Sequence, residues 1–146
     1  MVIFEVPGKP QGKARARTFY NPRLGRSQSV TPQNTVLYEN LVKQCYLAAE
    51  NSDKSTWFNS EPLEIFIDVY YEIPKSTTKK VRADIEKGKL YPTKKPDADN
   101  IAKVICDALN KVAYKDDSPI VNLSVQKLYS ADRPKVMVRI FKKEIL

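Results

Sequence analysis

The segment LEIFIDVYYE at 63–72 determines the fold class, because an apolar residue recurs at every second position along it. One face of this segment would carry its bulky apolar side chains: Leu63, Ile65, Ile67, Val69 and Tyr71. Alternation with a period of two residues predicts a β-strand that buries one face against a core. The other elements are assigned outward from this strand.

Three further segments show the same alternation and predict further strands: VIFEV at 2–6, VNLSVQKLY at 121–129 and KVMVRIFKK at 135–143. The last two are separated by the short turn sequence SADRP. A short turn between alternating segments is typical of a β-hairpin, so we expect these two strands to pair antiparallel with each other.

Residues 33–50 are predicted to form a helix. Thr31 suits the N-cap, with Pro32 at the first helical position. Apolar residues then recur at helical spacing: Leu37, Leu41, Cys45 and Ala48. The following polar loop, 51–62, contains Trp57 and Phe58, which we expect to cover the edge of the core.

Two more helices are predicted between the second strand and the third. A short one over 78–87 would be capped by Ser76 or Thr77 and stopped by Gly88. A longer one over about 98–111 has an apolar stripe at helical spacing: Ala98, Ile101, Ala102, Ile105, Leu109 and Val112.

The predicted order is therefore β-α-β-α-α-β-β within 146 residues, the size of a single domain spanning 1–146. Strands mixed with helices in a short chain predict an α/β (α+β) fold, with a mixed or mostly antiparallel sheet and helices packed on it. No apolar run is long enough to cross a membrane, and no signal peptide is recognisable. The two cysteines, Cys45 and Cys106, fall on apolar helix positions, so we expect buried free thiols and a cytoplasmic protein.

The charge of the chain limits the classes of partner that it can bind. The chain has 25 basic and 17 acidic residues, a net charge of +8, and this favours a polyanionic partner. Nucleic acid is favoured over a membrane surface because there is no basic amphipathic helix with bulky apolar anchors. Histidine is absent, which excludes Ser-His-Asp triads, Cys-His pairs and His-ligated zinc.

The basic residues concentrate in residues 8–30, which we read as a long loop that follows the first strand. Lys9, Lys13, Arg15 and Arg17 are its predicted DNA-binding residues, and we assign the same role to Lys94 and Lys95. The alternative is a solvated surface loop. Phe19 and Tyr20 interleave with the charges and favour contact with nucleic acid, because aromatic rings stack on bases.

An acidic cluster, KPDADN at 95–100, starts the helix near residue 98. The polar side of that helix carries Asp99, Lys103, Asp107 and Asn110. On spacing alone, Asp97 reads as an N-cap, Asp99 and Lys103 as an i,i+4 ion pair, and the later pair Asp116 and Asp117 as turn residues.

A metal site is the competing interpretation. A hard cation such as Mg²⁺ prefers several carboxylates. In a protein without histidine, a metal-activated water is a natural nucleophile for cleaving a phosphodiester. The Asp97/Asp99 pair and the later Asp116/Asp117 pair would converge on one cation only if the chain folds back or a partner chain contributes.

KPDADNIAKVICDALN followed by YKDDSPI resembles the signature of the RusA-type Holliday junction resolvases, a family common in bacteria and their prophages. The segment GKPQGKARAR at 8–17 is similar to the family's N-terminal region. The dense part of the resemblance covers about 95–121.

The resemblance implies a homodimeric, Mg²⁺-dependent endonuclease that resolves four-way DNA junctions in recombination and repair, with Mn²⁺ as the alternative ion. It implies Asp97, Asp99 and Asp117 as metal-binding catalytic residues. It further implies that Lys103 contacts the scissile phosphate or the attacking water, with Asp107 as a helper or structural acid and Asn100 in a structural hydrogen bond. The chain departs from the pattern at Lys111, where the family often has glycine, and at Pro119, where it often has glutamine.

Two other functions stay open on this sequence. One is a nuclease that prefers forks or flaps to intact four-way junctions. The other is a non-catalytic basic DNA-binding module whose acidic residues merely cap a helix.

Overall fold

The computed structural model describes residues 1–50, 52 and 61–144. Four strands form the main sheet in the order β1-β6-β4-β5: β1 (Val2–Pro7), β6 (Lys135–Lys142), β4 (Leu63–Tyr71) and β5 (Ile120–Tyr129). β4 pairs antiparallel with β6 and parallel with β5, so the sheet is mixed. The predicted α+β class is confirmed, and the predicted order holds with one added hairpin, described below.

The predicted hairpin between the last two strands is wrong, because β4 lies between β5 and β6. The turn that follows β5 instead crosses the end of β4, where the backbone N–H of Ser130 donates to the carbonyl of Tyr71 at 2.8 Å. Alternation identifies a strand but not its neighbour. In this chain the short connection joins two strands on either side of a third.

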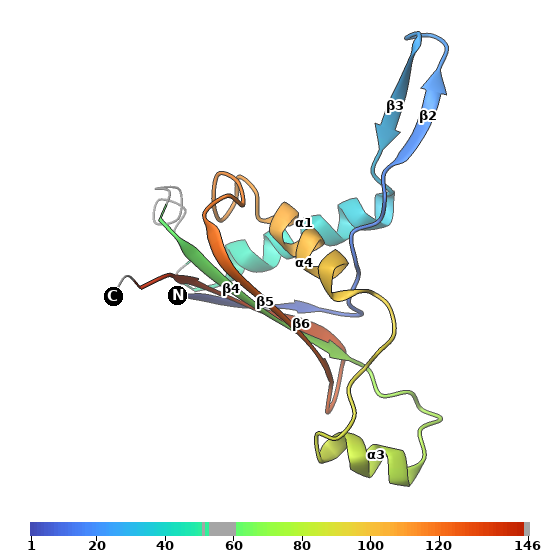
Figure 1. The fold of residues 1–146 in the computed structure, drawn as a ribbon, viewed down its shortest axis with the longest axis vertical. Coiled ribbons are helices and arrows are strands. Elements are labelled where there is room, and N and C mark those ends of the chain that lie inside the picture. Colours follow the sequence, from blue (N-terminus) through green and yellow to red (C-terminus); the bar gives the residue numbers. More distant parts are fainter. Residues whose placement is uncertain (51, 53–60, 145–146) are drawn as a thin grey trace.

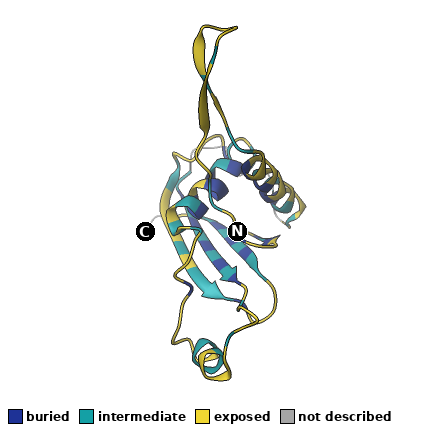
Figure 2. Cartoon of the chain, turned by 90° about the vertical axis from the view of Figure 1, so that its right-hand side faces the viewer, coloured by how far each residue is buried: buried dark blue, intermediate teal, exposed yellow. Residues whose placement is uncertain are grey.

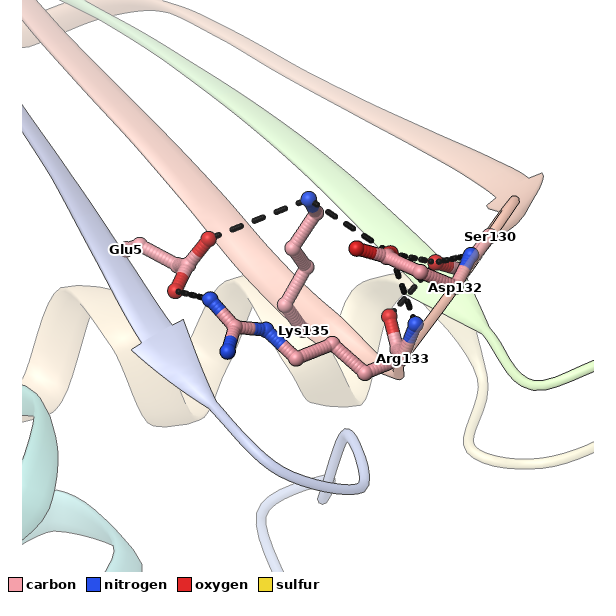
Figure 3. A network of polar contacts seen from close by, with 5 residues as sticks. All are labelled: Glu5, Ser130, Asp132, Arg133 and Lys135. Atoms are coloured by element: carbon pink, nitrogen blue, oxygen red, sulfur yellow. Dashed lines mark hydrogen bonds and ion pairs between the residues drawn. The ribbon is translucent and has the colours of Figure 1, made fainter.

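A polar network holds this crossing turn in place (Figure 3). The oxygen of the buried Ser130 hydroxyl lies 3.0 Å from Asp132 and 2.5 Å from the Arg133 carbonyl, the two acceptors that its single proton can reach. Glu5 on β1 then accepts from Arg133 at 3.2 Å and pairs with Lys135 at 3.8 Å. The turn is thereby tied to β1, at the opposite edge of the sheet from β5.

Two helices, α1 (Gln33–Ala48) and α4 (Ala98–Ala108), cover one face of the sheet (Figure 1). The core lies between these helices and the alternate side chains of β1, β4 and β6. On β4 these are the five residues of the predicted apolar face, all of them buried.

The predicted inward face of α1 is wrong. Its buried residues are Thr35, Tyr38, Val42 and Tyr46, whereas Leu37 and Leu41 are 58% and 37% exposed. Two stripes of large side chains run along this helix at the same period, and the tyrosine stripe packs inward. Thr31 is not the cap either, because Pro32 occupies the N-cap and the helix start has no side-chain capping bond.

α3 (Lys79–Glu86) stands away from the sheet on two long connections (Figure 1). The cap lies one residue later than predicted, at Thr78, whose hydroxyl accepts from the backbone N–H of Val81 at 3.3 Å. Gly88 follows the helix with φ of +71°, as expected for a glycine stop.

The long loop predicted over 8–30 contains a hairpin that the sequence pattern did not indicate. β2 (Arg17–Asn21) pairs antiparallel with β3 (Arg26–Val30) and projects from the body of the molecule (Figure 1). Leu24 and Gly25 both donate to the Asn21 carbonyl, and Gly25 takes φ of +63° in the turn. Nearly every hairpin residue is exposed (Figure 2), so there is no apolar alternation to detect.

In the described part of the chain, no helix is both long and apolar enough to span a bilayer. Trp57 and Phe58, predicted to cover the core edge, lie outside the described residues.

Candidate active site

The start of α4 is held in place from the sheet. The Tyr71 hydroxyl at the end of β4 donates to the carbonyl of Pro96 at 2.9 Å. Asp97 occupies the N-cap, and its carbonyl accepts the first helical bond from Ile101 at 3.0 Å. Its carboxylate makes no capping hydrogen bond, is half exposed and lies 3.9 Å from the Lys95 amine. The helix start therefore leaves the Asp97 carboxylate available.

α4 turns a wide apolar face to the core and a polar ridge outward. Ile101 and Ile105 are fully buried, while Asp99 and Lys103 are exposed. Among the described residues, no ion pair joins Asp99 to Lys103, so the predicted pair is absent. The N-terminal end of a helix carries a partial positive charge, and Asp97 and Asp99 lie beside it.

The basic segment after β1 runs beside the start of α4. The backbone N–H of Lys13 donates to the carbonyl of Asn100 at 2.9 Å. The predicted structural hydrogen bond of Asn100 is therefore made by its backbone. Gly12 allows the approach, because a Cβ there would lie 3.0 Å from the Asn100 Cβ and 3.1 Å from the Pro96 Cβ. The segment GKPQGKARAR therefore packs against KPDADN, and Gly12 makes this close contact possible. Neither motif by itself indicates why a glycine is needed there.

The resulting groove collects several of the predicted site residues. Lys9, Lys13, Lys95 and Asp97 all line it. Lys94 lies in the adjoining hollow with Lys9 and Lys95, and its amine sits 5.9 Å from the centre of the Tyr71 ring. Arg15 is exposed beyond the groove, and Arg17 begins β2.

Lys13 is tied to the fold more than the other basic residues of the groove. Its amine lies 2.9 Å from Glu39 on α1 and 3.3 Å from Asp107 on α4. Partial burial lowers the pKa of Lys13, but the hydrogen bonds and charges of Glu39 and Asp107 outweigh it and leave the pKa raised. The cation therefore bridges two helices, and Asp107 is engaged in that bridge.

Asp117 lies at the other end of α4. Tyr114 is fully buried and donates its hydroxyl to the Cys106 carbonyl at 2.7 Å, which fixes the turn against the helix. Asp116 is occupied within the turn, where it accepts from the backbone N–H of Ser118 at 2.9 Å and also from the Ser118 hydroxyl. These bonds lower the pKa of Asp116. The Asp117 side chain is exposed and has no such bond among the described residues.

A single chain does not bring the three predicted metal ligands together. Asp97 and Asp107 are ten residues apart along α4, about 15 Å at the helical rise. Asp117 lies near Cys106 at the Asp107 end, where burial and then the Asp117 charge raise the pKa of Cys106 to about 11. Within the described residues, no group of three acidic, cysteine or histidine side chains is placed to hold a metal ion. Two carboxylates are available at one end of α4 and one at the other.

The two departures from the resemblance have local structural effects. Lys111 adopts φ of +63°, the left-handed conformation that glycine takes without strain. Pro119 offers its carbonyl to the backbone N–H of Leu63 at 2.9 Å, which joins the turn to the first residue of β4. Pro119 therefore fixes the turn that carries Asp117.

Comparison with known proteins adds the decisive observation. The family model described as Endodeoxyribonuclease RusA matches residues 7–141. The chain belongs to the RusA family. It is also 37% identical over 141 residues to the Uncharacterized protein YqaN of Bacillus subtilis (strain 168), a match that covers 94% of this chain and 95% of that protein. Membership of the RusA family implies an endonuclease that acts on branched DNA.

Proposed function

We propose that this RusA-family chain is a Mg²⁺-dependent endodeoxyribonuclease that resolves four-way DNA junctions by paired symmetric nicks, acting as a homodimer. The observation that carries the proposal is the start of α4. Two exposed carboxylates, Asp97 and Asp99, are free of capping bonds there, and Asp97 shares its groove with Lys9 and Lys95. An acidic pair inside a basic groove suits a site that holds a cation and a phosphate together.

The donor set fits a hard divalent cation. Asp97 and Asp99 would supply two carboxylate ligands, and Asp117 of a second chain would supply the third, because within the described residues of one chain no group of three such side chains is placed to hold a metal ion. Mg²⁺, or Mn²⁺ in its place, would lower the pKa of a bound water and offset charge on the scissile phosphate.

Lys103 lies one helical turn after Asp99 on the same ridge. It is exposed and has no ion pair in the described structure, so its amine is free to reach the scissile phosphate. Lys9 and Lys95 flank the groove and would hold the neighbouring phosphates.

A homodimer is expected from the symmetry of the DNA substrate as well as from the number of carboxylate ligands that the metal needs. A four-way junction has near two-fold symmetry, and paired cuts need two sites related by a two-fold axis. A dimer that exchanges Asp117 between chains would couple assembly to metal binding.

The test is cleavage of a labelled four-way junction with and without Mg²⁺, with the nicks mapped. Asp97→Asn or Asp117→Asn should lower the cleavage rate about 100-fold or more, because several kcal/mol of charge stabilisation are lost. Junction binding should survive. Asp84→Asn on α3 removes one carboxylate elsewhere and serves as the matched control.

Forks, flaps and plain duplex are included as substrates at the same salt concentration. Faster cleavage of forks than of the four-way junction would replace the junction preference with the fork-nuclease function. If no Mg²⁺-dependent product forms at any protein concentration while DNA binding falls steeply with salt, the chain is a non-catalytic binding module.

A further inference from the structure

The hairpin of β2 and β3, residues 17–30, is called the arm below. It stands clear of the sheet and of α4 (Figure 1), and almost all of its residues are exposed (Figure 2). A two-stranded ribbon by itself is only marginally stable in water, so the arm gains little from its own pairing. The side chains of the arm therefore indicate which partner it binds.

The strand register sorts the arm into two different faces. Arg17 opposes Val30, Phe19 opposes Gln28, and Asn21 opposes Arg26. Because side chains alternate along a strand, these six residues share one face, here called the basic face. The other face carries only uncharged hydroxyl side chains: Thr18, Tyr20, Ser27 and Ser29.

The basic face is charged without compensation. No acidic residue occurs between Glu5 and Glu39, a stretch that contains six lysines and arginines. Arg17 and Arg26 make no ion pair with any residue in the described part of the chain. Phe19 lies between them and is 47% exposed.

The polar groups between the arginines are already oriented. Asn21 donates from its side-chain nitrogen to the Gln28 oxygen at 3.0 Å, and its own oxygen accepts from the backbone N–H of Arg23 at 3.0 Å. These bonds leave the amide nitrogen of Gln28 as a donor on the basic face. Arginine and glutamine side chains are the groups that hydrogen-bond to guanine and adenine edges.

We propose that the arm lays its basic face in the major groove of a duplex arm of the DNA substrate. This contact rests on the proposed junction-cleaving function and adds a second DNA-binding element, away from α4. The major groove admits a two-stranded β-ribbon, and the basic face combines phosphate-binding cations with base-edge donors. DNA is favoured as the partner of this face, because a polyanion compensates two arginines that make no ion pair in the described part of the chain.

The test compares three double variants of the full chain by fluorescence anisotropy with four-way junction and duplex DNA over a range of salt. Arg17→Gln with Arg26→Gln removes the cations of the basic face. Ser27→Ala with Ser29→Ala alters the other face. Lys142→Gln with Lys143→Gln removes the same charge from the end of β6, where these lysines pair with Glu61 and Glu64.

We expect the arginine variant to bind both DNAs about 10-fold or more weakly and to lower the salt slope by about 2, because two phosphate or base contacts are lost. The serine variant should bind like the unmodified chain, and the lysine variant should lose less than the arginine variant. Sedimentation velocity should give all three variants the oligomeric state of the unmodified chain.

Equal losses in the arginine and lysine variants would show a general charge effect and overturn the proposal, as would unchanged binding by the arginine variant. A change of oligomeric state in the arginine variant would also overturn it, because the arm would then be a clasp between subunits. If the unmodified chain bound no DNA at all, the proposed function would fail with it. If it bound and cleaved junctions while the arginine variant matched it, the arm proposal alone would fail.

Discussion

Lys111 adopts a backbone conformation that is unfavourable for any residue with a side chain. Its φ of +63° costs an L-residue about 1–2 kcal/mol relative to the right-handed region, whereas glycine adopts it freely. Part of the gain from a glycine here would be lost, since glycine has more conformational freedom in the unfolded chain.

Lys111→Gly should therefore raise the free energy of unfolding by about 0.5–1 kcal/mol. Urea unfolding followed by circular dichroism measures this change. Lys111→Val is the control, because a β-branched residue is disfavoured at positive φ and should lower the stability. If the glycine variant were less stable than the unmodified chain, the left-handed conformation at residue 111 would be wrong.

Cys106 is protected by the core more strongly than Cys45. Burial, followed by the nearby Asp117 charge, raises the pKa of Cys106 to about 11 from an ordinary value of 9.0, and the side chain is 6% exposed. Cys45 is partly exposed, and its pKa is also raised, chiefly by burial. The expectation of a buried free thiol is confirmed for Cys106 and holds in part for Cys45.

At pH 8, a thiol-specific reagent should label the Cys45→Ala variant, which retains Cys106, slowly in the folded state and fully in urea. The Cys106→Ala variant, which retains Cys45, should be labelled before it unfolds. Because the fold favours the neutral thiol of Cys106, this group should cost stability as the pH rises from about 9 toward about 11. Rapid labelling of Cys45→Ala in the folded protein would contradict the burial of Cys106.

At the scale of elements, Lys13 connects the basic segment to both helices. Its amine contacts Glu39 and Asp107, and the backbone N–H of Ala14 donates to the Thr35 hydroxyl at 3.3 Å. Bonds between charged groups that are mostly withdrawn from solvent contribute more than surface ion pairs.

Lys13→Gln should therefore lower the free energy of unfolding by about 1–2 kcal/mol. Lys9→Gln removes one cation from the same groove, where Lys9 has no ion pair in the described structure, and should change stability by less than about 0.5 kcal/mol. Chemical denaturation of the two variants measures both values. Equal effects would mean that the bridge between α1 and α4 contributes nothing.

The elements also show what patterning could predict. Apolar residues at every second position identified β4 and its buried face, since a half-buried strand leaves its period in the sequence. Pairing did not follow, because nothing in SADRP reveals that β4 lies between β5 and β6. On α1 the exposed stripe that contains Leu37 has the same helical period as the buried stripe that contains Tyr38, so the period alone could not show which one faces the core.

At the scale of the whole molecule, the sequence motifs predicted the family, which the match over 7–141 confirms, but not the geometry of the site. Spacing placed Asp97 and Asp99 correctly at the start of α4. It could not show that Asp117 lies near Cys106, at the far end of that helix, because the position depends on how Tyr114 packs. The arm was not predicted, because an exposed ribbon buries no side chains and so has no apolar pattern.

In the proposed dimer, two chains build each metal site, and complementation of Asp97→Asn by Asp117→Asn examines this composite site. Each variant alone has two defective sites. A mixed dimer has one site with Asp97, Asp99 and Asp117 all intact if Asp117 comes from the partner, and none if all three come from one chain.

The measurement is Mg²⁺-dependent nicking of a four-way junction after the two inactive variants are unfolded and refolded together. The composite site predicts that the mixture regains activity and nicks one strand per binding event, while each variant refolded alone stays inactive. An inactive mixture, with mixed dimers shown to form by differently tagged chains, would contradict the composite site and place all three carboxylates in one chain.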